Sequence, residues 1–191
     1  MIDMIDDPGK GPDRGWLRTR PIGLSGLSPD QAKVLSGREL ELARRSGTEK
    51  AYGVAKDGNV VVEREGEEDR IIFDDDELAR LAGCVLTHNH PSGKSFSLAD
   101  IQLATQYHLD EIRSVTRSYV FRARPPKEGW PAWETAIYPM IAEALRQATQ
   151  QIIPDAERYH WSEAKRDQER QHAFIQWLSK LCGFRYHREE E

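Results

Sequence analysis

Two histidines stand one residue apart near the middle of the chain, and an aspartate follows the second after ten residues. His88 and His90 close an apolar run, and Asp100 comes after a turn that contains Pro91 and Gly93. Side chains two apart on a strand project to the same side, so both imidazoles can reach a single ion. Imidazole is a common zinc ligand at neutral pH. The pattern therefore predicts a metal held by His88, His90 and Asp100.

Such a ligand set has a definite chemistry. Three protein ligands leave the fourth tetrahedral position of zinc for water, as in catalytic sites, and zinc can lower the pKa of that water to about 7. A second interpretation also fits, because paired histidines at a strand end are commonly surface residues. The stretch from Ser97 to Asp100 equally fits a helix start capped by serine. The strand, the turn and the acid in the next helix together favour the metal site.

Composition excludes several other kinds of site. The chain has 191 residues, and its two cysteines, Cys84 and Cys182, are far apart, which argues against a disulfide framework and a thiolate zinc site. The formal net charge is −5, so nucleic acid is not expected as the main substrate. No apolar run reaches bilayer length, and the acidic N-terminus lacks the order of a secretory signal. We therefore expect no membrane contact and a cytoplasmic location.

Regular elements must hold the ligand segment, and the hydrophobic pattern predicts them. Their order favours the α/β fold class, with a mixed sheet flanked by helices. Helices are expected at 28–47 with a break near Gly37, at 75–81, 97–108, 131–150 and 155–183, with Pro154 separating the last two. Strands are expected at 50–55 and 60–62, joined by a hairpin at Asp57-Gly58, and at 70–73, 82–88, 112–115 and 119–122.

The same pattern divides the chain into three parts. Residues 1–27 read as a flexible N-terminal arm, with one short edge strand near Leu17–Ile22. Residues 28–128 form the predicted metallohydrolase domain, and residues 129–191 a C-terminal helical extension. The closing helices carry Phe174, Trp177 and Leu178 on one side and charges on the other, which predicts packing or partner docking there.

The string His88-Asn89-His90-Pro91, followed by Ser97-Leu98-Ala99-Asp100, resembles the JAMM motif of MPN-domain (JAB-domain) metalloproteases. It is especially similar to the RadC-like and phage-associated bacterial branch, over roughly residues 28–125. The resemblance implies a cytidine-deaminase-like α/β fold with Zn²⁺ at one end of the sheet. It also implies a catalytic glutamate on the first strand after the first long helix, a place that Glu49 occupies.

The resemblance implies two catalytic residues. Glu49 would act as general base on the water and then pass the proton to a leaving amine. Sequence position alone does not raise it above the neighbouring glutamates Glu39, Glu41, Glu63 and Glu65. Ser97 matches the serine that would steady the oxyanion. Six residues separate His90 from Ser97, one fewer than in the family's motif, so Ser95 is an alternative for this role.

The predicted function is a zinc-dependent metallopeptidase or isopeptidase that hydrolyses an amide bond in a protein or peptide, such as a ubiquitin-like conjugate or a phage protein. The alternative is a phage or mobile-element accessory module that uses the scaffold for binding. A role in DNA metabolism is disfavoured by the acidic balance. Solvated or packing roles are expected for the remaining histidines, which are His108, His160, His172 and His187.

Overall fold

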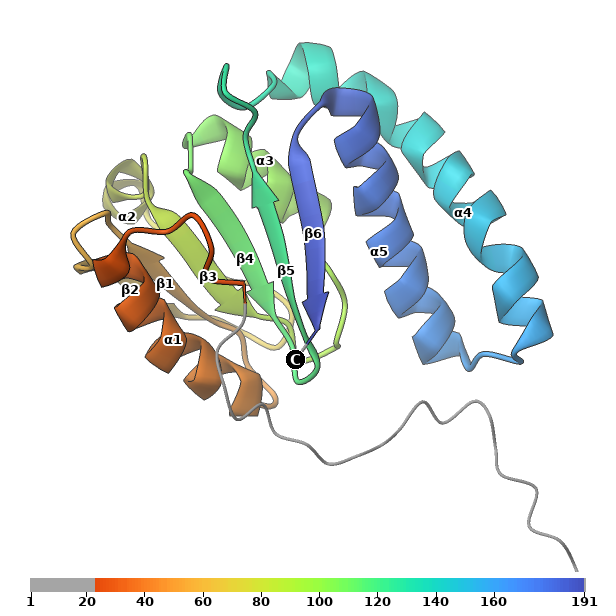
Figure 1. Cartoon of the computed structure of the whole chain (residues 1–191), viewed down its shortest axis with the longest axis horizontal. Helices are drawn as coiled ribbons and strands as arrows, with labels where there is room; N and C mark the ends of the chain where they lie inside the picture. The colour runs from red at the N-terminus through yellow and green to blue at the C-terminus, as the bar shows by residue number, and fades with distance from the viewer. Residues whose placement is uncertain (1–22, 191) are drawn as a thin grey trace, which may run out of the picture.

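A six-stranded mixed sheet forms the centre of the computed structural model, which describes residues 23–190 (Figure 1). The strand order is β2-β1-β3-β4-β5-β6, with β3 and β4 parallel and every other neighbouring pair antiparallel. The strands are β1 (Lys50–Val54), β2 (Val60–Glu65), β3 (Val85–Asn89), β4 (Glu111–Val115), β5 (Tyr119–Arg124) and β6 (Arg185–Glu190). The predicted α/β class with a mixed sheet is confirmed.

Helices cover both faces of this sheet (Figure 1). On one face, α1 packs through Leu35 and Leu42 against Tyr52 and Val54 of β1. The other face forms the larger core, where α3 and α5 join side chains of the central strands. The helices are α1 (Pro29–Arg44), α2 (Asp75–Arg80), α3 (Leu98–Gln106), α4 (Ile141–Arg158) and α5 (Glu163–Cys182), with a π-helical turn at Trp133–Ile137 and a 3₁₀ turn at Tyr138–Met140.

The first helix begins as predicted and runs on without the expected break. Ser28 caps it, accepting a hydrogen bond from the backbone N–H of Gln31, and Pro29 occupies the first turn. The break predicted near Gly37 is wrong. Gly37 faces open space, and the buried residues on either side of it, among them Leu35 and Glu39, keep the helix seated on the sheet.

The strand predicted at 70–73 is also wrong. Glu67 donates its N–H to the carbonyl of Arg70 in a turn and accepts from the N–H of Glu49 at 2.7 Å. Because of these hydrogen bonds, the backbone of residues 67–70 forms an irregular connection. Ile71 and Phe73, whose apolar character favoured a strand, instead line the cavity described below.

The C-terminal part departs furthest from expectation. Pro154 lies inside α4 and does not end it, because the helix is held against α5 by the buried residues Ala144, Ala148 and Ala156. The predicted helical extension 129–191 also ends in a strand. The left-handed Gly183 closes α5, and β6 then pairs antiparallel with β5. No strand was predicted in this stretch, which had been placed in the helical extension.

Two exclusions can be compared with the structure. Cys84 is buried and Cys182 half-buried, and both are free thiols, so the expected lack of a disulfide is confirmed. No helix in the described part of the chain is long and apolar enough to cross a membrane. The edge strand predicted near Leu17–Ile22 and nearly all of the predicted arm 1–27 lie outside the described residues.

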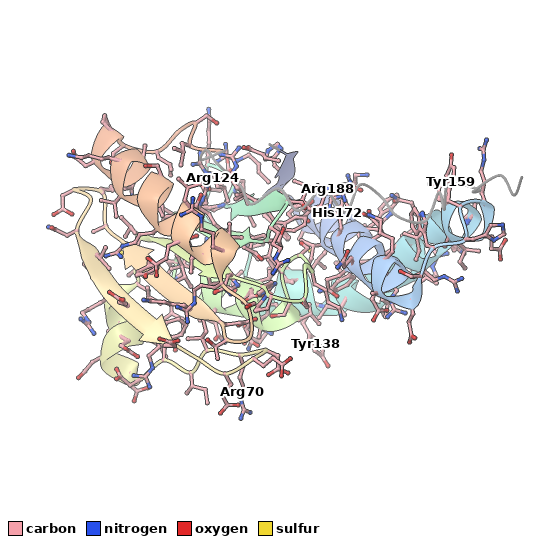
Figure 2. The ribbon with its side chains drawn as sticks, turned by 90° about the horizontal axis from the view of Figure 1, so that it is seen from below. Arg70, Arg124, Tyr138, Tyr159, His172 and Arg188 are labelled. Carbon is pink, nitrogen blue, oxygen red and sulfur yellow. The ribbon has the colours of Figure 1, made fainter. Side chains whose placement is uncertain are left out.

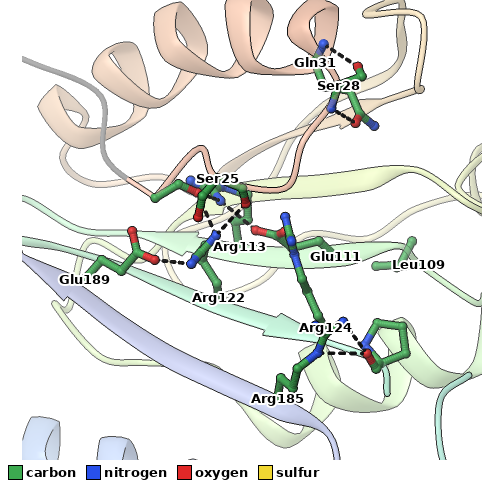
Figure 3. A network of polar contacts seen from close by, with 12 residues as sticks. Ser25, Ser28, Gln31, Leu109, Glu111, Arg113, Arg122, Arg124, Arg185 and Glu189 are labelled. Carbon is green, nitrogen blue, oxygen red and sulfur yellow. Dashed lines mark hydrogen bonds and ion pairs between the residues drawn. The ribbon is translucent and has the colours of Figure 1, made fainter. Parts of the chain in front are cut away.

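An ion-pair network lies between α1 and the sheet, and Figure 3 labels three of its members, Glu111, Arg113 and Arg124. The fully buried guanidinium of Arg113 pairs with Glu39 of α1 at 3.0 Å and with Glu111 at 2.6 Å. Glu111 also pairs with Arg124. Glu39 further accepts a hydrogen bond from Thr87 on β3, at 3.1 Å. The network thus ties α1 to the two central strands at a point where no water can replace a lost partner.

Removing one partner should therefore be costly. In Glu39→Ala, the buried charge of Arg113 loses the carboxylate of α1 and keeps that of Glu111, and we expect the free energy of unfolding to fall by about 3–5 kcal/mol. The exposed Glu63, which pairs with Lys50 on the surface, provides the control, and Glu63→Ala should cost less than about 1 kcal/mol. Urea unfolding of both variants measures the difference. Equal losses would mean that the network contributes nothing beyond a surface pair.

Candidate metal centre

The predicted ligands converge at one end of the sheet. His88 lies in β3 and His90 directly follows it, and both point to the face on which α3 lies, because side chains alternate along the strand. Asp100 is the third residue of α3, which starts beneath that strand end. Both histidines are buried, and the Asp100 side chain is only 19% exposed. The structure therefore brings together the three residues that the sequence predicted.

The distances between their donor atoms suit a single cation. Nε2 of His88 and Nε2 of His90 are 2.9 Å apart. The Asp100 carboxylate faces each of them with one oxygen, Oδ1 at 3.3 Å from His88 and Oδ2 at 3.5 Å from His90. Ligands about 2.0–2.1 Å from a tetrahedral zinc are roughly 3.4 Å from each other. The two distances to Asp100 match this value and the distance between the histidines is shorter, so the donor chemistry and the spacing suit a metal ion.

The surroundings of the two histidines also suit metal binding. Nδ1 of His90 donates to the backbone carbonyl of Ser95 at 2.8 Å, which leaves the lone pair on Nε2, the nitrogen that lies close to Nε2 of His88 and to Asp100. Burial and the neighbouring His88 lower the pKa of His90, so its imidazole is neutral. Burial opposes charge on His88 too, but Asp100 and Glu49 raise its pKa overall. A metal that binds His88 would have to displace the proton that this raised pKa favours.

Asp100 is held as a carboxylate. Burial opposes its charge, but the two histidines and the N–H of Ser97 keep its pKa well below the usual range. Ser97 caps α3, donating its N–H and its hydroxyl to Asp100 Oδ2 at 2.6 and 2.8 Å. Its hydroxyl oxygen accepts from the Asp100 N–H in return. The helix start considered as an alternative is therefore real, and it orients the carboxylate of Asp100 at the same time.

Glu49, the residue directly before β1, faces the same centre. Its Oε1 lies 3.7 Å from Nε2 of His90, and the residue is buried. Burial, with help from Asp100 and Asp69, raises the pKa of Glu49 to about 7, while His88 opposes the shift. A bound cation would lower it again. Of the glutamates compared in the sequence, Glu49 is the one that lies against the histidines.

Asn89, between the two histidines, has a function that the sequence did not reveal. Its side chain points away from the metal ligands and accepts the N–H of Lys50 at 2.7 Å. It also donates to the carbonyl of Thr48 at 3.1 Å. The amide thus holds the backbone on both sides of Glu49. Strand alternation alone indicates that Asn89 faces the opposite way, but its partners lie about forty residues earlier in the chain.

A cavity of about 1020 Å³ opens from the centre. Glu49, His88 and His90 form its floor, and the irregular segment 67–71 and α3 form its walls. The walls combine acidic groups with apolar ones. A cavity of this kind can admit a ligand to the three residues.

Two residues from the C-terminal part lie close to the centre although the sequence assigned them no site role. Tyr186 of β6 contacts Ser95, in the loop between His90 and Ser97, and His172 of α5 contacts the Tyr186 hydroxyl. No sequence spacing indicates such a contact, because 91 residues separate Ser95 from Tyr186. Ser95 itself is buried, whereas Ser97 is exposed at the cavity.

The other histidines stay away from the centre. His108, His160 and His187 are exposed, as expected for solvated residues. His108 and His160 follow helix ends with positive φ. His172 is half-buried and hydrogen-bonded to Tyr186, which is a packing role. Among the described residues, the group that could hold a metal is thus His88, His90 and Asp100.

Comparisons of the chain with models of protein families, with curated proteins and with solved structures found no match. The relation to JAMM proteins is therefore a resemblance of motif residues. What the structure itself adds is a mixed α/β fold and a His-His-Asp group that could hold a metal ion.

Proposed function

We propose that the chain is a zinc-dependent peptidase or isopeptidase of JAMM type, acting on an amide bond in a protein substrate in the cytoplasm. The observation that carries the proposal is the position of Glu49. A buried carboxylate lies 3.7 Å from a histidine of a three-residue ligand set, at the floor of a large cavity. A purely structural metal site would have a closed ligand set and would need no such base.

Each residue then has one task in hydrolysis. His88, His90 and Asp100 would hold the zinc, which supplies an activated water and polarises the scissile carbonyl. Glu49 takes the proton of the attacking water and delivers it to the leaving nitrogen as the C–N bond breaks. The products are a carboxylic acid and an amine. Burial of Glu49 and of the histidines keeps competing solvent away from this proton transfer.

Ser97 is the better candidate for the oxyanion role. Its hydroxyl lies at the exposed cavity mouth, and rotation away from Asp100 would direct the O–H into the cavity. Ser95, the alternative, is buried and its hydroxyl is 2.7 Å from that of Tyr186. Although the loop is one residue shorter than in the motif, Ser97 therefore still lies beside Asp100. One donated hydrogen bond to an oxyanion is worth roughly a hundredfold or more in rate.

The test combines metal analysis with cleavage. Purified protein should contain about one zinc per chain, and a proteome-derived peptide library should show new termini that depend on the protein. A strong chelator should abolish both the metal and the cleavage, added zinc should restore them, and zinc should raise the unfolding temperature. A chain that binds no zinc, or cleavage that a chelator does not affect, would refute the proposal.

A second candidate is an accessory binding module. Its support is limited to exposed apolar side chains along α4 and at its C-terminal cap, where Leu145, Ile153 and Tyr159 are 48%, 46% and 44% exposed. Such side chains would contact a docked partner, for example a phage protein. In the cleavage test this candidate predicts bound zinc at most, and no new peptide termini.

A further inference from the structure

The ligands His90 and Asp100 are joined by a loop, residues 91–97, that folds back on the first of them. The carbonyl of Ser95 accepts a hydrogen bond from Nδ1 of His90 at 2.8 Å, and that of Lys94 lies 3.2 Å from the same nitrogen. A carbonyl that binds the outer nitrogen of a ligand histidine sets both its tautomer and the direction of its ring. The position of the Ser95 backbone therefore decides where His90 points.

The C-terminal part of the chain holds Ser95 in place. The hydroxyl of Tyr186, on β6, is 2.7 Å from the hydroxyl of Ser95. The same tyrosine oxygen lies 2.8 Å from Nδ1 of His172, on α5. Figure 2 shows His172 near the sheet, while Tyr159 lies toward the far end of the helical pair. Two hydrogen bonds thus connect α5 through β6 to the Ser95 side chain, and a third joins the Ser95 backbone to His90.

Helix α5 approaches the rest of this loop closely. Gln168 donates its side-chain amide to the carbonyl of Ser92 at 2.9 Å, and Gln171 donates to the carbonyl of Phe96. A Cβ atom at Gly93, whose φ is +74°, would come within 2.7 Å of the Gln168 amide nitrogen. A side chain at Gly93 would thus disturb the contact with Gln168.

Phe96 completes the connection from inside the core. Its side chain is fully buried, and its ring lies between those of His88 and Tyr186, at centroid distances of 6.4 and 6.1 Å. The loop is therefore held on its buried side by packing and on its outer side by polar contacts from α5 and β6.

We propose that Tyr186 is a positioning residue of the metal centre: its hydroxyl, shared by Ser95 and His172, holds the loop carbonyl that orients His90. The proposal rests on the proposed function only in taking the centre to be a metal site. With this role for Tyr186, α5 and β6 contribute to the centre itself, in addition to the partner docking expected of the C-terminal helices. Tyr186 does not touch the metal or the reacting atoms.

The competing explanation is an ordinary buried tyrosine whose hydroxyl has found partners. The geometry favours positioning, because Tyr186 meets the same residue, Ser95, whose carbonyl binds Nδ1 of His90. Burial lowers the pKa of His172 to about 4, so its imidazole is neutral, and burial also raises the pKa of Tyr186, so the hydroxyl keeps its proton. The three groups can therefore share hydrogen bonds without any of them carrying a charge.

The test measures zinc affinity in Tyr186→Phe, which keeps the ring and removes only the hydroxyl. Competition with a chromophoric chelator should give about tenfold weaker binding, at the lower end of the effect of outer partners on metal sites. The absorption spectrum of the cobalt-loaded variant should shift as well, because the ring of His90 is less well oriented. Tyr119→Phe is the matched control on the neighbouring strand, because the Tyr119 ring packs against Phe121 and Arg188.

Ser95→Ala removes the same hydrogen bond from the Ser95 side. It replaces Tyr186→Phe as the test variant if Tyr186→Phe does not fold. The double variant should bind zinc about as weakly as either single one, because both changes remove one interaction. Unchanged affinity and an unchanged cobalt spectrum in Tyr186→Phe, with only a lower unfolding temperature, would overturn the proposal and leave the proposed function standing. A wild-type chain that binds no zinc would overturn both.

Discussion

The His88→Ala variant is expected to bind zinc more than about a hundredfold more weakly than the wild-type chain. Loss of an outer partner alone costs about 10- to 100-fold in metal affinity, and His88 would contact the ion directly. Its Nε2 lies 2.9 Å from that of His90 and 3.3 Å from Asp100, so alanine leaves a two-ligand site. Zinc per chain, measured by mass spectrometry after dialysis, should fall from about one to near zero.

The control replaces a histidine that stands outside the centre. His187 is exposed on β6, and His187→Ala should leave the zinc content unchanged. If both variants kept their zinc, the metal would be held elsewhere, and the two histidines would form only a buried hydrogen-bonded pair with Asp100. Far-ultraviolet circular dichroism of each variant separates loss of the metal from loss of the fold.

The Glu49→Gln variant is expected to keep its zinc and to lose about 10²- to 10⁴-fold in turnover. Glutamine has nearly the same size as glutamate but cannot take a proton from water, and general bases contribute about this much to hydrolysis. Because Glu49 lies 3.7 Å from the nearest histidine nitrogen, it is a base beside the ligand set and its loss leaves three ligands. Initial rates on a peptide identified in the library screen measure the effect.

A second acidic residue tests whether position or charge matters. Glu68 lines the same cavity from the segment 67–71 and is exposed. Glu68→Gln removes the same charge and should change kcat less than about twofold. Full activity in Glu49→Gln would exclude this residue as the base. Equal losses in the two variants would mean that the cavity needs negative charge for substrate binding and that Glu49 has no special part in proton transfer.

The sequence was most informative where function depends on local geometry. His88 and His90 are two apart at a strand end, and this spacing alone places both imidazoles on one face. Ser97 and Asp100 stand at the cap and the third position of α3, where the capping pattern predicts them. The hairpin of β1 and β2 and the start of α1 at Ser28 were predicted for the same reason, since turn and cap residues act over a few positions.

The sequence was least informative where a long-range contact outweighs a local preference. Pro154 disfavours a helix locally, but packing of α4 on α5 keeps the helix intact. Residues 70–73 have a strand-like composition, yet their backbone joins an irregular connection beside Glu49. The stretch 185–190 carries charges that resemble a solvated tail, but it becomes an edge strand because β5 offers unpaired backbone groups.

The metal centre combines both kinds of information. By itself, the sequence determined the residue types and the local spacing of His88, His90 and Asp100, because strand alternation and helix capping need no distant partner. Only the tertiary structure decided that Glu49 faces these ligands and that Tyr186 holds the loop between them. Those placements depend on which strands become neighbours in the sheet, and that choice is made by burial of the whole core.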